Sequence, residues 1–170
     1  MSAAKCPGCG VELPDRGAAE RMRASQACWE LYGELAAYTL ARGRGFLHQY
    51  GVDAYQAQHA DPGASGITIA FSLIGLYLAS ERGWTGLQVQ RAHMALAREK
   101  VAWPRFELPR ESAPVTARDV LNAEPGDERD AALKQWCAAV WESWRHAHAW
   151  TRRFCEERLA GSLSRRVRSR

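Results

Sequence analysis

The chain has 170 residues, of which 46% are hydrophobic and 25% are charged, so it is long enough for one domain with its own hydrophobic core. Its formal net charge is +4, and leaving out the four arginines among the last ten residues lowers the 23 basic residues to 19, the number of acidic residues. The chain before this tail is therefore neutral, which argues against a broad basic surface for nucleic acid.

Residues 1–24 are predicted to be irregular, because Pro14 and Gly17 interrupt any helix there. Ser25 is a favourable N-cap for the first helix. Thr85 and Thr116 each begin a capping-box pattern, in which a side chain three residues later bonds back to the backbone of the threonine. These caps and the spacing of apolar residues predict helices over residues 25–42, 46–59, 67–81, 85–100 and 116–122.

Two longer segments complete the predicted elements. Residues 101–115 contain three prolines and are expected to form an ordered loop. Residues 127–159 contain neither proline nor glycine, and their apolar residues recur at helical spacing. We therefore predict one amphipathic helix there, with a length of about 45 Å for about 30 residues. No segment shows the alternation that is typical of a strand.

The predicted fold class is all-α. We expect an irregular helical bundle around the helices over 67–81 and 127–159, with a zinc-knuckle-like N-terminal segment. Residues 1–160 are expected to form a single helical domain that includes the N-terminal cysteine turn within 1–24. The arginine-rich residues 161–170 are expected to form a disordered basic tail.

No segment has the pattern of a membrane span or of an export signal. The most apolar run, from Ile67 to Ala79, has 13 residues, whereas a membrane-spanning helix needs about 20. The first residues also lack a basic region followed by an apolar run. We therefore expect a cytoplasmic protein without membrane contact, whose five cysteines favour metal binding over a disulfide framework.

The most informative motif is Cys6-Pro7-Gly8-Cys9-Gly10. Two thiolates that are separated by two residues can bind one ion from a single turn. Pro7 stiffens this turn, and the two glycines let the backbone curl its N–H groups toward the sulfurs. A redox role is the weaker alternative, because a thioredoxin-like CxxC belongs to a βαβ unit that this sequence does not predict. The motif therefore predicts half of a zinc site.

A tetrahedral zinc site needs two further ligands. Cys28 is the best third candidate, because it is expected in the first turn of a helix, where the helix dipole favours a thiolate. Cys137 and Cys155 are 18 residues apart on the predicted last helix. That spacing separates them by about 27 Å, so they cannot both bind one ion. Each is better interpreted as a small core residue.

The fourth ligand is expected from one of five histidines. We favour His59, at the end of the second helix, and place His48 next. His146 and His148 are two residues apart on one helix, so they diverge by about 200° and are poorly placed to hold one ion together. His93 lies on a stretch that looks exposed and is not expected to be a ligand. The predicted Zn²⁺ ligands are therefore Cys6, Cys9, Cys28 and His59.

A second group of polar residues lies close to His59 in the sequence. Asp53, Tyr55 and Gln58 belong to the same predicted helix, and such side chains either act as acids and bases or form buried hydrogen-bond networks. The buried network is the favoured interpretation. The alternative is a pocket formed by Asp53, Tyr55, Gln58 and His148.

Three motifs in this order resemble those of a family of small bacterial proteins of unknown function. They are Cys6-Pro-Gly-Cys9-Gly10, the Cys28-Trp29 pair and Val52-Asp-Ala-Tyr-Gln-Ala-Gln-His59, which match CPxCG, a Cys-Trp pair and VDAYxxQH in that family. The resemblance covers most of residues 5–80 and, more loosely, the last helix. It implies conventional roles for Cys6, Cys9, Cys28, Asp53, Tyr55, Gln58 and His59, and it implies no particular activity.

The chain also departs from that family at two places. Phe71 stands where members tend to carry a histidine, and residues 17–21 lack the histidine or tyrosine that members tend to have there. If those histidines serve a catalytic site, the resemblance implies that this chain keeps the fold and loses the activity.

Three functions follow from these observations. The favoured one is a zinc-stabilised helical protein that acts by binding a small molecule or another protein. The first alternative is a zinc enzyme with an open metal position near His59 and with Asp53 or His148 as acid or base. The second alternative is nucleic-acid binding through the arginine-rich tail. The sequence contains no P-loop, GxGxxG, GxSxG or HExxH motif, so it assigns no reaction.

Overall fold

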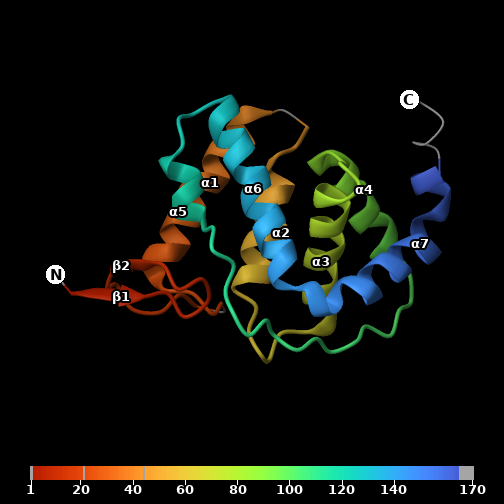
Figure 1. The fold of residues 1–170 in the computed structure, drawn as a ribbon, viewed down its shortest axis with the longest axis horizontal. Coiled ribbons are helices and arrows are strands. Elements are labelled where there is room, and N and C mark those ends of the chain that lie inside the picture. Colours follow the sequence, from red (N-terminus) through yellow and green to blue (C-terminus); the bar gives the residue numbers. More distant parts are fainter. Residues whose placement is uncertain (1, 21, 44, 165–170) are drawn as a thin grey trace.

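The computed structural model describes residues 2–20, 22–43 and 45–164. Within these residues the chain is mainly helical, which confirms the coarse expectation, and a short two-stranded sheet lies at the N-terminal end (Figure 1). The elements in chain order are β1 (Ala3–Lys5), β2 (Glu12–Pro14), α1 (Gln26–Arg42), α2 (His48–Gln58), α3 (Gly66–Ser80), α4 (Gly86–Leu96), α5 (Ala117–Asn122), α6 (Asp127–Ser143), the 3-10 helix η1 (Arg145–Ala147) and α7 (His148–Ser164).

The core lies where α2, α3 and α6 pack against one another, with α1 and α5 on one side and α4 and α7 on the other (Figure 1). Helix α3 is the most apolar element, and all residues from Ser72 to Leu78 are buried. Trp136 of α6 and Trp144, which directly follows α6, are fully buried against α2, where their indole N–H groups donate to Gln58 Oε1 at 2.9 Å and to Ala57 O at 3.3 Å. The two tryptophans therefore bury a large apolar surface without leaving their N–H groups unpaired.

The N-terminal segment contains a hairpin that the sequence did not predict. Strands β1 and β2 pair antiparallel, with Ala3 opposite Pro14 and Lys5 opposite Glu12. The expectation of a wholly irregular segment was wrong here, because strands of three residues are too short to show a period of two. Pro14 is tolerated because it ends a strand at the edge of this small sheet.

The single helix predicted over residues 127–159 was also wrong. Helix α6 ends at Ser143, Trp144 leaves the helical conformation with φ −95° and ψ 23°, and α7 begins at His148. The His148 ring stacks on the Trp141 ring with centroids 3.7 Å apart, and its Nε2 lies 2.9 Å from Trp141 O. These contacts replace helical hydrogen bonds at the bend, which lets α6 pack on α2 and α3 while α7 packs on α3.

Helix α7 continues to Ser164, so the first four residues of the expected tail, 161–164, are helical. The four arginines of that tail, Arg165, Arg166, Arg168 and Arg170, lie outside the described residues. Within the described part of the chain, no helix combines the length and apolar character that a membrane crossing requires.

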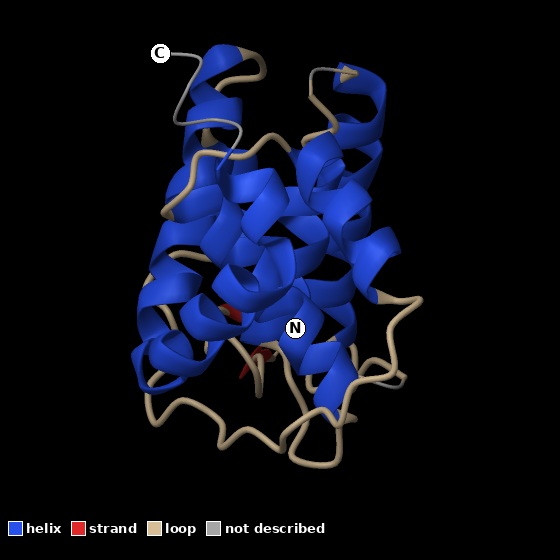
Figure 2. Ribbon diagram, turned by 90° about the vertical axis from the view of Figure 1, so that its right-hand side faces the viewer, coloured by secondary structure: helices blue, strands red, loops and turns tan. Residues whose placement is uncertain are grey.

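Residues 101–115 form a long loop without regular structure, as their prolines predict, and we call this segment the strap. The strap runs from α4 to α5 beneath the helices (Figures 1 and 2). At its beginning, the Trp103 ring packs against the Phe71 and Phe154 rings with centroids 5.4 and 5.3 Å apart. Further along, the carbonyls of Ala113 and Val115 accept hydrogen bonds from the Gln58 side-chain amide. These contacts explain how a segment without helix or strand keeps a defined path.

Alanine substitutions at two glycines in helix interiors should change the stability of the fold in opposite directions. A Cβ on Gly75 of α3 would lie 1.9 Å from the Asp53 carboxylate, whereas a Cβ on Gly33 of α1 would meet nothing within 4 Å. We therefore expect Gly75→Ala to lower the free energy of unfolding by about 1–3 kcal/mol through overpacking. We expect Gly33→Ala to raise it by about 0.5–1 kcal/mol, because glycine is a poor helix former. Urea unfolding of both variants checks this, and equal effects of the same sign would contradict the packing described.

Candidate metal centre

Four buried side chains converge at the N-terminal end of the molecule. Cys6 and Cys9 come from the turn between β1 and β2, Cys28 comes from the first turn of α1, and His59 directly follows α2. One ligand atom from each of these residues lies within 4.8 Å of all the others, and none of the four residues is more than 6% exposed. Such a cluster of three sulfurs and one imidazole can hold a metal ion.

The backbone of the cysteine turn brings the first two sulfurs to one place. Cys6 N–H donates to Val11 O, and Gly10 N–H donates to Cys6 O, each at 2.9 Å. Gly10 adopts φ +75°, a conformation that costs a residue with a side chain more than it costs glycine. The turn between the two cysteines is therefore closed by its own hydrogen bonds and by a glycine at the required position.

The start of α1 supplies the third sulfur and supports the first. The Ser25 side chain accepts a hydrogen bond from Cys28 N–H at 3.3 Å, which makes Ser25 the N-cap of α1, as predicted. The Ser25 N–H in turn donates to Cys6 Sγ at 3.5 Å. The position of Cys28 near the positive end of the helix dipole favours a thiolate there.

The orientation of His59 follows from Tyr55, one helical turn earlier in α2. His59 Nδ1 lies 2.9 Å from Tyr55 O, a carbonyl that can only accept, so the Nδ1 atom carries the proton. In the neutral ring Nε2 then keeps its lone pair, and it lies 3.4 Å from Cys28 Sγ. This is the arrangement of histidines that bind a metal ion through Nε2.

Two further contacts hold the His59 ring. The Tyr55 ring stacks on it with centroids 4.0 Å apart, and Gly8 packs against it so closely that a Cβ on Gly8 would lie 2.5 Å from His59 Cδ2. From the sequence we expected Gly8 to let the backbone of the turn curl toward the sulfurs. Its close packing against the imidazole could not be predicted from the sequence. A side chain at position 8 would displace a candidate ligand.

The three thiols are coupled to one another. Hydrogen bonds from Cys28 and Cys9 lower the pKa of the Cys6 thiol, and the bonds that Cys28 makes to Cys6 and Cys9, together with burial, raise the pKa of Cys28. These hydrogen bonds therefore favour the thiolate form of Cys6 and the protonated form of Cys28. A cation that binds all three sulfurs must displace the remaining thiol protons, so its binding becomes tighter as the pH rises.

The other residues singled out in the sequence have separate partners. Asp53 is 3% exposed, its Oδ1 accepts from Gln49 Nε2 at 3.0 Å, and its Oδ2 packs against Gly75. Gln58 accepts from Trp136 and donates to Val115 O at 2.8 Å, so it joins the strap to α6. His148 belongs to the bend between α6 and α7. Of Asp53, Tyr55, Gln58 and His148, the described contacts bring Tyr55 against the four-residue cluster.

The remaining histidines lie away from the cluster and bond elsewhere. His48 Nδ1 lies 3.1 Å from Thr39 Oγ1, and His146 Nε2 lies 2.9 Å from Glu107 O. The stretch around His93 is largely exposed, as expected, but His93 itself is half-buried, because its ring packs on Phe71 with centroids 5.0 Å apart. Burial lowers the pKa of His93 to about 4, so this histidine is neutral near pH 7.

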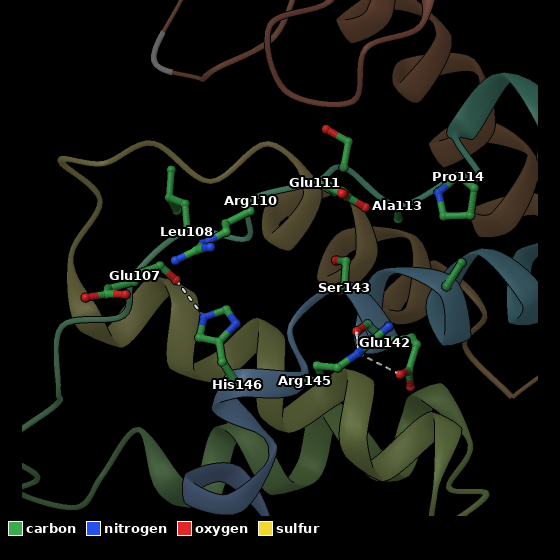
Figure 3. A pocket seen from close by; sticks show the side chains of 12 residues that line it. Glu107, Leu108, Arg110, Glu111, Ala113, Pro114, Glu142, Ser143, Arg145 and His146 are labelled. Carbon is green, nitrogen blue, oxygen red and sulfur yellow. Dashed lines mark hydrogen bonds and ion pairs between the residues drawn. The ribbon is translucent and has the colours of Figure 1, made fainter.

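One cavity has a volume of about 650 Å³ and separates the strap from the end of α6 (Figure 3). Strap residues Glu107 and Arg110 line one wall of this groove, and Glu142, Arg145 and His146 line the other. A second cavity of about 630 Å³ touches His59 directly. The strap is tied to the cysteine turn, because Ser112 Oγ donates to Gly8 O at 2.7 Å.

Comparison with known proteins gives a family but no activity. The model of the family of unknown function DUF5946 matches residues 4–145, which include the cysteine turn, α1 to α6 and the strap. The chain therefore belongs to this family. Searches of curated proteins and of solved structures found no match.

The burial of Asp53 predicts a pH dependence of stability. Burial raises its pKa well above the ordinary value, so the folded chain keeps a proton that the unfolded chain loses above about pH 4. The stability that this proton contributes is complete below the unfolded pKa and is lost as the pH rises through the folded pKa. Asp53→Asn should remove that loss, because the amide mimics the protonated carboxyl group.

Urea unfolding of the two proteins from pH 4 upward checks this prediction, with the difference between their unfolding free energies as the readout. We expect the difference to change with pH in favour of the asparagine variant. A difference that stays constant over the whole range would show that Asp53 is ionised in the folded protein.

Proposed function

We propose that this DUF5946 protein binds one zinc ion through Cys6, Cys9, Cys28 and His59, that the ion stabilises the fold, and that the protein acts by binding another molecule. The observation that carries the proposal is the convergence of these four ligand atoms in the protein interior. Three sulfurs and one imidazole nitrogen form a donor set typical of structural zinc. The soft thiolates disfavour magnesium and calcium, which prefer oxygen ligands.

The distances between ligand atoms support a tetrahedral ion. With Zn–S bonds of about 2.3 Å and a Zn–N bond of about 2.05 Å, tetrahedral angles separate two sulfurs by about 3.8 Å and a sulfur from the nitrogen by about 3.6 Å. Cys9 Sγ lies 3.7 Å from Cys28 Sγ, and Cys28 Sγ lies 3.4 Å from His59 Nε2. These separations leave room for a single zinc ion at the centre of the cluster.

The ligand count favours a structural role for this ion. Structural zinc sites use four protein ligands, whereas catalytic sites use three and keep a position for water. All four candidate ligands are buried here, and Asp53, the acid or base of the enzymatic alternative, contacts Gln49 and Gly75. The arrangement therefore gives the enzymatic alternative no specific support.

A zinc ion at this place would join three separate parts of the chain. Cys6 and Cys28 are 22 residues apart, and Cys28 and His59 are 31 residues apart, so one ion would close two loops and restrict the unfolded chain.

The zinc ion would also fix the position of Gly8, whose carbonyl accepts a hydrogen bond from Ser112 of the strap. The strap forms one wall of the groove of about 650 Å³, a volume in the range of small-molecule sites. We therefore propose that a small molecule or a protein segment binds in this groove.

Metal content of the purified protein tests the site. We expect one zinc per chain after expression under reducing, zinc-replete conditions, and a loss of that zinc in Cys6→Ser, Cys28→Ser and His59→Asn. Cys137→Ala and Cys155→Ala are the matched controls, because both cysteines are also buried but lie outside the cluster. Chains without zinc, or equal losses in the control variants, would overturn the proposal.

The structural role has its own readout in the same samples. Removal of a ligand that binds only the folded state lowers stability by RT ln(1 + [L]/Kd), or about 4 kcal/mol at a free zinc concentration of about 1,000 Kd. A chelator should therefore lower the unfolding midpoint of the wild-type protein and leave that of Cys6→Ser unchanged. An unchanged wild-type midpoint after complete zinc removal would show that the ion does not support the fold.

A further inference from the structure

We propose that Tyr55 is a positioning residue for two of the four metal ligands, His59 and Cys28, an inference that rests on the proposed metal site. Tyr55 is 1% exposed and lies one helical turn before His59 in α2. This spacing places its carbonyl and its ring beside the imidazole. Its hydroxyl reaches the start of α1, where Cys28 lies. One residue therefore contacts ligands from two separate helical segments.

The contacts with His59 fix both the tautomer and the plane of the ring. The Tyr55 carbonyl lies 2.9 Å from Nδ1, which leaves Nε2 as the metal-binding atom. The Tyr55 ring stacks on one face of the imidazole with an interplanar angle of 26°, and the Gly8 backbone also packs closely against the imidazole. Rotation of the imidazole would therefore break the contact with the Tyr55 ring.

The contact with Cys28 has a different chemical consequence. The Tyr55 hydroxyl donates a hydrogen bond to Cys28 Sγ over 3.9 Å. A hydrogen bond to a metal-bound thiolate withdraws electron density from sulfur, so it changes the electronic structure of the bond between sulfur and metal. The ring and the hydroxyl of Tyr55 therefore act on different ligands and can be removed one at a time.

Tyr32 offers a matched comparison within the same aromatic stack. Its ring lies parallel to the Tyr55 ring with centroids 4.1 Å apart, on an α1 turn that follows Cys28. The metal ligand His59 stacks on Tyr55, so Tyr32 is one ring further from the ligand. Substitutions at Tyr32 disturb the stack and the packing of α1 on α2 without removing the contacts that Tyr55 makes to the ligands.

The experiment compares Tyr55→Phe, Tyr55→Leu and Tyr32→Leu in the full chain with Co²⁺ in place of zinc. The absorption of the sulfur-to-cobalt charge-transfer band reports the electronic state of the bound thiolates. Competition with a chromogenic chelator reports the affinity for Zn²⁺. We expect Tyr55→Phe to shift the charge-transfer band to longer wavelength while it keeps the affinity within a few-fold. We expect Tyr55→Leu to weaken zinc binding by about 10–100-fold, the usual cost of losing a partner of a metal ligand.

Tyr32→Leu should leave the charge-transfer band at the wild-type position and weaken zinc binding less than Tyr55→Leu does. The inference is overturned if Tyr55→Phe has the wild-type spectrum, or if the two leucine variants lose affinity equally. Tyr55→Phe keeps the ring and the buried volume, so it remains informative if Tyr55→Leu fails to fold. A wild-type chain that binds neither cobalt nor zinc would overturn the metal site itself, which is a different result from a metal-binding chain that is insensitive to Tyr55.

Discussion

The convergence of three sulfurs and one imidazole within 4.8 Å is the constraint on which the N-terminal third of the structure depends. The ligand atoms come from a turn, a helix start and a helix end that are distant in the sequence. Hydrogen bonds among the three buried thiols lower the pKa of Cys6 and raise the pKa of Cys28. A cation that displaced the thiol protons would be bound by several thiolates at once, so its binding would stabilise the folded arrangement of these residues.

Helix α2 links this region to the rest of the fold. Its buried face packs on α3 and α6, while its last turn carries Tyr55 and leads into His59. Gln58, also in that turn, bonds to Trp136 of α6 and to the strap. A change in the position of α2 would therefore also displace residues of the cluster and of the strap, and so alter the groove beside α6. In this arrangement the four-residue cluster is a continuation of the hydrophobic core.

Much of this structure was accessible from the sequence, for identifiable physical reasons. Capping residues such as Ser25 and Thr85 located helix starts, and ligand chemistry grouped the four residues that the structure brings together. The bend at Trp144 was missed because no proline or glycine marks it, and the stacking of His148 on Trp141, seven residues earlier, is not visible as a helix-breaking pattern in the sequence. The half-burial of His93 against Phe71 and the packing of Gly8 on His59 were missed because both depend on neighbours that are far away in the sequence.

X-ray absorption at the zinc edge of the purified wild-type protein tests the central claim most directly, because it counts and identifies the atoms that surround the metal. The arrangement of Cys6, Cys9, Cys28 and His59 predicts three sulfurs at about 2.3 Å and one nitrogen at about 2.0–2.1 Å, without an oxygen ligand. Two or fewer sulfurs, or a water oxygen in the fourth position, would contradict a closed structural site built from these four side chains.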